Sequence, residues 1–359
     1  MNWRGAHRGQ ALLAGWLGLV LTVACAPTSA GRAPAAAPAG VASGGTADVA
    51  ASAAPASLTQ VRMGVTGHSP TYWHAYIATR KGFFAQEGLD FDTIVIPSSV
   101  TQTQALIAGD VNFNSYSVDS VAKAVVGGAP LKLIGSAQEV PNFLLIVDHD
   151  ITTWNDLRGK TLGAGSPGGY YDIVLRAMLA ANGLQPGDYE LRSIGNSSLR
   201  LPAIQTGQIA GAIMGDPDAF VARSAGYQPL GSVHDYVHDV QYTGYAIADE
   251  WGKAHEALVV GFLRGILRAI AWINDPANKD EAERIYGEIT GLGGPYLDDI
   301  YDQMVTQKML STTARPNMKG LENITNLAYQ QGSLNFAPPL DTWVDMSYLD
   351  KAIDQQRRH

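Results

Sequence analysis

The chain has almost no cysteine: one residue, Cys25, among 359. A single thiol can form no disulfide within the chain and cannot supply a multi-thiolate metal site. The eight histidines form no HExxH or HxH pattern. His234 and His238 lie four positions apart but have no third ligand nearby, which is typical of a surface pair. The sequence therefore predicts no metal centre.

Basic residues are also scarce. The chain has 25 Lys and Arg against 33 Asp and Glu, a net charge of −8 at pH 7, and no basic run. A surface that binds nucleic-acid phosphates needs clustered Lys and Arg. We therefore expect no nucleic acid among the partners of this protein.

The motifs of several common enzyme classes are missing. No GxSxG elbow, P-loop or GxGxxG follows a predicted strand. The sequence GAGSPGG at 163–169 is rich in glycine, but the Lys-Ser/Thr pair of a P-loop does not follow it. We therefore expect no catalytic residues and no cofactor. If the chain were an enzyme, Asp216 would be the candidate acid or base.

The N-terminal residues have the pattern of an export signal. Arg4 and Arg8 precede an apolar run at 11–24, which is too short for a permanent membrane span. Cys25 follows in LTVAC, which resembles the cleavage box of bacterial lipoproteins. We interpret 1–24 as a lipoprotein signal peptide and Cys25 as the lipidated new N-terminus, with plain secretion as the alternative.

Residues 25–57 consist almost entirely of Ala, Pro, Gly, Ser and Thr after Cys25. This composition cannot bury a core, so we expect a disordered tether between the lipid and the folded part. Folded sequence then begins near residue 58.

Residues 61–97 have the pattern of a complete βαβ unit. The runs 63–66 and 91–96 have the length and composition of strands. Apolar residues recur near helical spacing between them, and Arg80, Lys81 and Gly82 are typical of a helix C-terminus. In such a unit the loop after the first strand lies at the carboxyl edge of the sheet, where open α/β sheets bind small molecules.

Two motifs carry a resemblance to a known family. RKGFFAQEGL at 80–89, and DLRGKTLG at 156–163 with SPGG after it, resemble sequences of the extracytoplasmic solute-binding proteins of ABC importers. The closer resemblance is to binders of sulfonates, taurine, nitrate, thiamine-precursor pyrimidines and riboflavin, and it covers roughly residues 61–335. A pyrimidine-synthesising enzyme family shares this fold, but its motif needs several cysteines.

The resemblance implies an α/β fold with the two-lobed architecture of type II periplasmic binding proteins. Each lobe would be a mixed sheet flanked by helices, with the ligand cleft between the lobes. We place the first crossing between lobes at GSAQEVPN, 135–142, and interpret YTGYAIAD, 242–249, as the returning strand. This predicts a first lobe of 58–142 and 246–359 and a second lobe of 143–245.

An internal repeat also favours two similar lobes. Residues 104–120 and 203–219 both have the order helix end, glycine, short strand and polar loop. Gly109 and Gly207 suit left-handed helix C-caps. Each strand would bring its polar loop to the edge of its own sheet, and in the second lobe that loop contains Asp216 and Asp218.

The segment SPGGYYD at 166–172 is a further candidate site. Ser166 and Pro167 suit the start of a helix, and the glycines after them leave backbone N–H groups free at its positive end; a tight turn packed against the first lobe is the alternative. Consecutive tyrosines in the first turn point roughly 100° apart, so we favour only Tyr171 as a ligand contact. The candidate ligand-binding residues are Tyr72, Trp73, Ser99, Tyr116, Gln138, Ser166, Gly168, Tyr171, Asp216 and Tyr242.

The predicted loops narrow the class of ligand. They are rich in aromatic residues and contain Asp119, Glu139, Asp216 and Asp218, but no Arg or Lys. A small anion would more often need a bidentate Arg, whereas a flat heterocycle needs ring faces and acceptors for its N–H groups. We therefore expect a planar heterocycle. Among the ligands of the resembled family, riboflavin ranks first, a thiamine-precursor pyrimidine second, and a sulfonate or other small organic anion third.

The mechanism implied by the resemblance is closure of two lobes over the ligand, followed by delivery to an ABC permease and its ATPase. No covalent bond would be made or broken. The protein would act as an extracytoplasmic monomer, held at the membrane by the lipid on Cys25.

Overall fold

The computed structural model describes residues 58–195 and 197–358. The predicted signal peptide, Cys25 and the tether at 25–57 lie outside the described residues. All described residues belong to one compact unit. Within them, no helix has both the length and the apolar character needed to cross a membrane.

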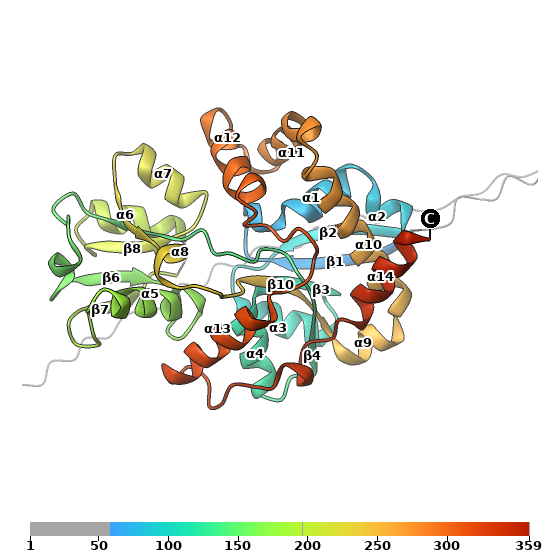
Figure 1. Ribbon diagram of the computed structural model, residues 1–359, viewed down its shortest axis with the longest axis horizontal. Helices are drawn as coiled ribbons and strands as arrows, with labels where there is room; N and C mark the ends of the chain where they lie inside the picture. The colour runs from blue at the N-terminus through green and yellow to red at the C-terminus, as the bar shows by residue number, and fades with distance from the viewer. Residues whose placement is uncertain (1–57, 196, 359) are drawn as a thin grey trace, which may run out of the picture. The chain divides into compact units, whose positions relative to one another are not determined.

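The first sheet has five strands in the order β2-β1-β3-β10-β4 (Figure 1). Its strands are β1 (Thr59–Val65), β2 (Leu89–Val95), β3 (Phe113–Ser117), β4 (Leu131–Ser136) and β10 (Thr243–Ala248). β1 pairs in parallel with β2 and β3, whereas β10 is antiparallel to both of its neighbours. The sheet is therefore mixed, and its first two strands form the predicted βαβ unit.

The second sheet repeats this plan with the order β7-β6-β8-β5-β9. Its strands are β5 (Leu144–Val147), β6 (Thr161–Ala164), β7 (Glu190–Ser193), β8 (Gly211–Met214) and β9 (Pro229–Ser232). β6 pairs in parallel with β7 and β8, and β5 is the antiparallel strand. β3 and β8 thus occupy equivalent places, which agrees with the internal repeat seen in the sequence.

Helices surround both sheets (Figure 1). Those of the first sheet are α1 (Trp73–Arg80), α2 (Phe83–Gln86), α3 (Ser99–Ala108), α4 (Val118–Val126), α9 (Asp249–Ala254), α10 (Glu256–Ile273), α11 (Lys279–Thr290), α12 (Pro295–Tyr301), α13 (Met318–Gln330) and α14 (Ser347–Arg357). Those of the second sheet are α5 (Tyr170–Ala181), α6 (Arg200–Gln205), α7 (Asp218–Ser224) and α8 (Val233–Tyr236). We call each sheet with its helices the first lobe and the second lobe.

Short helical turns complete the connections. They are η1 (Pro70–Tyr72), η2 (Trp154–Leu157), η3 (Ser197–Leu199), η4 (Pro276–Asn278), the π-helical η5 (Asp302–Thr306) and η6 (Leu340–Thr342). Gly109 at φ +82° and Gly207 at φ +69° have the left-handed conformation expected after α3 and α6. His238 lies beyond the end of α8, so it does not share a helix face with His234.

The core of the first lobe is built on aromatic rings. Phe84 packs at 4.1 Å from Phe91, and Phe113 at 4.1 Å from Phe262 of α10, measured between ring centroids. Phe84 is fully buried and belongs to this core. α10 packs against α1 on one side and against α14 on the other, so the C-terminal residues lie on the first lobe.

Two segments cross between the lobes, 137–143 after β4 and 237–242 between α8 and β10. They are tied together at the first lobe, because Thr243 N–H donates to Gln138 O at 2.9 Å and Gln138 N–H donates to Thr243 Oγ1 at 3.0 Å. The buried amide of Gln241 also donates to Ser136 Oγ at 2.9 Å. The lobe boundaries at 142/143 and 245/246 stay predictions, although β10 already joins the first sheet at Thr243.

Candidate ligand-binding site at the crossing segments

A chain of hydrogen bonds runs from the loop after β1 to the loop after β8. Thr71 Oγ1 donates to Gln138 Oε1 at 2.6 Å, and Gln138 Nε2 donates to Asn142 Oδ1 at 3.2 Å. Asn142 Nδ2 then donates to Asp216 Oδ2 at 3.0 Å. Because each amide is used as both acceptor and donor, the direction of the chain is fixed and ends on the carboxylate. The structure thereby brings two predicted site residues, Gln138 and Asp216, into one network.

Asp216 also stabilises the start of α7, since its Oδ1 accepts a 3.1 Å hydrogen bond from Phe220 N–H. Burial raises the pKa of the Asp216 carboxyl to about 6, with the charge of Arg223 acting in the opposite direction. Arg223 itself forms a 2.7 Å ion pair with Asp299 of α12. This pair joins α7 of the second lobe to α12 of the first.

Aromatic side chains meet beside this network. Phe143 stacks on Tyr171 with ring centroids 4.4 Å apart, and its edge meets Tyr242 at 4.8 Å. The guanidinium carbon of Arg200 lies 4.5 Å from the centroid of the Tyr171 ring. Two groups cannot both lie over one face of a ring at such distances, so Tyr171 is covered on both faces. In this arrangement Tyr171 offers a ligand its edge and hydroxyl rather than a ring face.

Arg200 corrects the sequence-based view that no basic residue approaches the site. It lies on α6, is 1% exposed, and donates from Nε to Ile194 O at 3.3 Å and from Nη1 to Ile213 O at 2.5 Å. Burial lowers the pKa of its guanidinium, and the nearby Tyr171 and Asp218 act in the opposite direction. The argument against an anionic ligand rested on the absence of Arg and Lys and on the presence of acidic and aromatic residues. Arg200 removes the first of these two premises.

The segment around Gly168 differs from the prediction. α5 begins at Tyr170 with Gly169 as its N-cap, so Ser166 does not cap this helix. Gly168, at φ +69°, donates its N–H to Asp172 Oδ2 at 2.9 Å, and its carbonyl accepts a hydrogen bond from Lys123 of α4. A Cβ at this position would lie 2.7 Å from Ser333 Oγ. The glycine therefore permits a tight turn against the first lobe, and its N–H is not free for a ligand.

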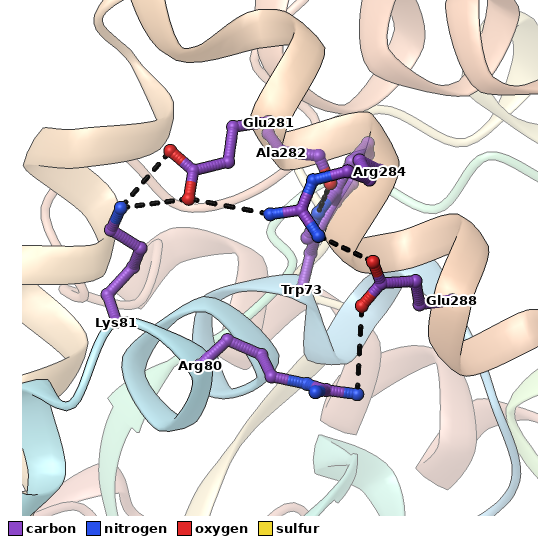
Figure 2. Close-up of polar contacts among 7 residues, drawn as sticks. All are labelled: Trp73, Arg80, Lys81, Glu281, Ala282, Arg284 and Glu288. Carbon is purple, nitrogen blue, oxygen red and sulfur yellow. Dashed lines mark hydrogen bonds and ion pairs between the residues drawn. The ribbon is translucent and has the colours of Figure 1, made fainter.

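Trp73 faces the interior of the first lobe. Its indole N–H donates to Ala282 O of α11 at 3.1 Å (Figure 2). The centroid of its ring lies 4.8 Å from that of the Tyr286 ring. The same figure shows the ion pairs that hold α11 on α1, Lys81 with Glu281 at 2.9 Å and Arg80 with Glu288 at 4.0 Å. The ring of Trp73 is fully buried, so it positions α11 instead of lining a surface.

Three other predicted ligand contacts, Tyr72, Tyr116 and Ser99, form hydrogen bonds within the first lobe. Tyr72 is buried, and its hydroxyl accepts a 3.1 Å hydrogen bond from Thr66 N–H. Tyr116, on β3, pairs its hydroxyl with Thr103 Oγ1 at 3.2 Å, and burial raises its pKa to about 12. Thr103 also donates to Ser99 O at 2.9 Å, so Ser99 and Tyr116 belong to a second polar group around α3.

Sequence reasoning missed Tyr286 on α11, Tyr296 on α12 and Phe220 on α7. The Tyr296 ring lies 4.7 Å from Phe220, which follows Asp216 by four positions, and 6.4 Å from Tyr286. Each tyrosine lies on the apolar side of its helix, a pattern that by itself indicates core packing.

Along residues 58–195 and 197–358, no three His, Cys, Asp or Glu side chains gather in a way that could hold a metal ion.

Comparisons with known proteins agree with this fold. The family model described as NMT1/THI5 like matches residues 69–279. YtlA of Bacillus subtilis (strain 168), named as a binding protein, is 22% identical over 311 residues, 84% of this chain and 92% of YtlA. The riboflavin-binding protein RibY of Chloroflexus aurantiacus is 29% identical over 277 residues, 74% of this chain and 73% of RibY.

A solved structure shows the same architecture. The periplasmic sulfonate-binding protein SsuA of Methylobacillus flagellatus KT superposes with a TM-score of 0.68 at 14% identity, over 84% of this chain and 96% of SsuA. The two-lobed fold of type II periplasmic binding proteins is thereby confirmed for this chain.

Proposed function

Because this chain belongs to the NMT1/THI5-like family, we propose that it is the solute-binding component of an ABC importer. The observation that carries the proposal is the hydrogen-bond chain from Thr71 to Asp216, set beside the aromatic group of Phe143, Tyr171 and Tyr242. It brings polar and aromatic side chains together at the junction of two similar lobes. Small-molecule sites usually combine apolar and aromatic side chains with a few placed polar groups.

The proposed ligand is a planar heterocycle, with riboflavin as the first choice. Similarity to RibY supports this choice, and so do the aromatic side chains around the crossing segments and the carboxylate of Asp216, which can accept a hydrogen bond from a ring N–H. A thiamine-precursor pyrimidine is the second candidate, since it also combines a flat ring with N–H donors.

A sulfonate or another small organic anion is the third candidate, and one observation favours it. Arg200 is a buried cation beside Tyr171, at the end of the second sheet where β8 delivers Asp216. A buried guanidinium is well suited to bind an anionic oxygen. Similarity of fold to SsuA is consistent with this alternative.

Ligand capture would proceed by closure of the lobes about the crossing segments. Contacts between the lobes, such as Arg223 with Asp299 and Lys123 with Gly168, would form as the lobes close. The closed form would then dock on a membrane permease with its ATPase. We further propose that the protein acts as a monomer outside the cytoplasm, anchored by lipid on Cys25.

Calorimetric titration of ligands into the purified full-length chain tests the proposal. Riboflavin, 4-amino-5-hydroxymethyl-2-methylpyrimidine (a thiamine-precursor pyrimidine) and taurine are titrated separately. We expect riboflavin to bind with one-to-one stoichiometry and to quench Tyr and Trp fluorescence. Tight binding of taurine without heat from either heterocycle would contradict the ranking. An enzyme acting on a pyrimidine is the alternative class, so the ligand is recovered after prolonged incubation; chemical conversion would contradict a binding function.

A further inference from the structure

Four tyrosine hydroxyls of the first lobe are buried without a hydrogen-bond partner among the described residues, one of them that of Tyr245 on β10, and the other three lie on neighbouring helices. These three belong to Tyr76, Tyr286 and Tyr296, none of which is more than 5% exposed. Folded proteins pair nearly all buried polar groups, because an unpaired one keeps the cost of its lost hydration. Three such hydroxyls on neighbouring helices indicate a place where another polar molecule can supply their hydrogen bonds.

The three tyrosines form one cluster although they come from three helices, α1, α11 and α12. Ring centroids are 6.5 Å apart between Tyr76 and Tyr286, and 6.4 Å apart between Tyr286 and Tyr296. α1 and α11 are held together by the hydrogen bond from Trp73 to Ala282 and by the ion pairs of Lys81 with Glu281 and Arg80 with Glu288 (Figure 2). We call Tyr76, Tyr286 and Tyr296 the tyrosine cluster.

The tyrosine cluster faces the loop that contains Asp216. Tyr296 packs on Phe220 at 4.7 Å, and Phe220 N–H donates to Asp216. Burial, followed by the negative charge of Asp216, raises the pKa of the Tyr296 hydroxyl, and the same two causes are among those that raise the pKa of Tyr286. Tyr296, which packs on Phe220, and Tyr286 beside it are therefore the members of the cluster nearest to the Asp216 loop.

Asp216 keeps unused capacity to accept hydrogen bonds. A carboxylate offers about four lone-pair positions on its two oxygens. Phe220 N–H occupies one position on Oδ1 and Asn142 Nδ2 occupies one on Oδ2. The site thus combines a carboxylate that accepts with three hydroxyls that can donate.

A ligand group that complements this arrangement needs an N–H for the carboxylate and oxygen acceptors for the hydroxyls. A sulfonate has only acceptors, so it offers no N–H to the free lone pairs of the Asp216 carboxylate. A lactam or imide edge, in which C=O stands next to N–H, has both functions and no charge. We propose that the tyrosine cluster and Asp216 bind the lactam or imide edge of a neutral heterocycle, an inference that rests on the proposed heterocycle-binding function.

The test compares riboflavin with 3-methylriboflavin, in which a methyl group replaces the imide N–H, on the full-length chain. We expect the methylated compound to bind at least about tenfold more weakly. In Asp216→Asn the difference between the two ligands falls below about threefold, because the acceptor that reads the N–H is lost. Tyr286→Phe and Tyr296→Phe each weaken riboflavin binding about three- to tenfold and keep the aromatic ring.

Tyr301→Phe is the matched control. Tyr301 is also a buried tyrosine of α12, but its hydroxyl already donates to Ile273 O at 3.0 Å. Its loss should lower thermal stability and leave riboflavin affinity within twofold. The methylated ligand changes no protein residue, so its result does not depend on the folding of any variant.

Two results would overturn the inference. Riboflavin binding that changes by less than twofold on methylation and on both Phe substitutions would show that the tyrosine cluster does not bind the lactam or imide edge. The proposed heterocycle binding would be unaffected by this result. If the aminopyrimidine or taurine binds in place of riboflavin, no lactam edge is recognised; binding of taurine alone would also contradict the proposed heterocycle ligand.

Discussion

The side-chain amide of Asn142 donates a 3.0 Å hydrogen bond to the carboxylate of Asp216, 74 positions further along the chain. Asn142 is itself oriented by Gln138, which is oriented by Thr71 in the loop after β1. The position of Asp216 in the second lobe is therefore set by groups that begin in the first. A residue held in this way suits recognition, because its acceptors are oriented before a ligand arrives.

Substitution of Asp216 tests this role directly. Asp216→Asn keeps the size and one acceptor oxygen but adds a donor, so we expect ligand affinity to fall by about 1 to 3 kcal/mol. The free energy of unfolding at pH 7 should change by less than about 1 kcal/mol, because the substitution also removes a partly buried charge. Calorimetry and chemical denaturation give the two values.

Asp218→Asn is the control for that experiment. Asp218 is the first residue of α7, two positions after Asp216, and burial raises the pKa of its carboxyl as well. Unlike Asp216, Asp218 forms no hydrogen bond with Asn142. Its affinity should stay within about twofold of the wild type. Unchanged affinity in both variants would remove these aspartates from the site, and a loss of stability alone in Asp216→Asn would assign it to the α7 turn.

Trp73 gives a second prediction, since the sequence placed it among the ligand contacts. Trp73→Phe leaves a space beside Tyr286 and leaves the Ala282 carbonyl without its indole donor. We expect the free energy of unfolding to fall by about 2 kcal/mol with ligand affinity within about threefold. A large loss of affinity in a variant of normal stability would show that Trp73 contributes to ligand binding.

The two-lobed fold was predicted from the resemblance carried by RKGFFAQEGL and DLRGKTLG, and two local signals supported it. The βαβ unit rests on strand composition and on the helix ending at Gly82, and the internal repeat on the matching places of Gly109 and Gly207. Each signal lies within about 20 residues, the range over which hydrophobic period and capping act.

The candidate site was less predictable because its members come together only in the folded chain. Arg200 and Tyr296 lie on helices whose patterns indicate ordinary surface and core positions, and nothing local relates them to Tyr171 or Asp216. Ser166 had a suitable residue type for a cap, but Gly168 at φ +69° and its bond to Asp172 move the helix start to Tyr170.

The ion pair between Arg223 and Asp299 provides a third prediction, because it joins the lobes at 2.7 Å. Both side chains are about one-third exposed, so the pair should be weak. Arg223→Met should reduce ligand affinity about twofold to threefold in low salt, and the difference should disappear near 1 M salt. Affinity is measured by fluorescence quenching in both conditions.

Lys351→Met is the matched control, since Lys351 pairs with Glu256 at 2.8 Å within the first lobe. It removes a cation without touching the contact between lobes. If both variants changed affinity equally, the Arg223 effect would reflect net charge and not closure.

Lipidation of Cys25 is a fourth prediction, on a residue outside the described ranges. The wild-type precursor expressed in a bacterial host should label with fatty acid and partition into the detergent phase, because acyl chains supply the membrane affinity. Cys25→Ser removes the sole thiol and should abolish both properties. A variant that stays lipid-labelled and membrane-bound would show that the anchor lies elsewhere.

The last prediction concerns pH. Burial raises the Asp216 pKa to about 6 in the folded protein, against about 4 in an unfolded chain. Between these values the folded state binds more protons, so the contribution of Asp216 to stability is complete below pH 4 and is lost as pH rises to 6. Arg223, Asn142 and Phe220 N–H favour the charged form, whereas Asp299 opposes it.

Wild type should therefore lose up to about 2 kcal/mol of unfolding free energy relative to Asp216→Asn between pH 4 and pH 7. Ligand affinity should change in the opposite direction, because a carboxylate that accepts an N–H bond must be ionised. Riboflavin binding should weaken about tenfold from pH 7.5 to pH 5 in wild type and much less in the variant. Denaturation and titration at several pH values provide the data, and parallel profiles for the two proteins would show that Asp216 neither titrates near 6 nor contacts the ligand.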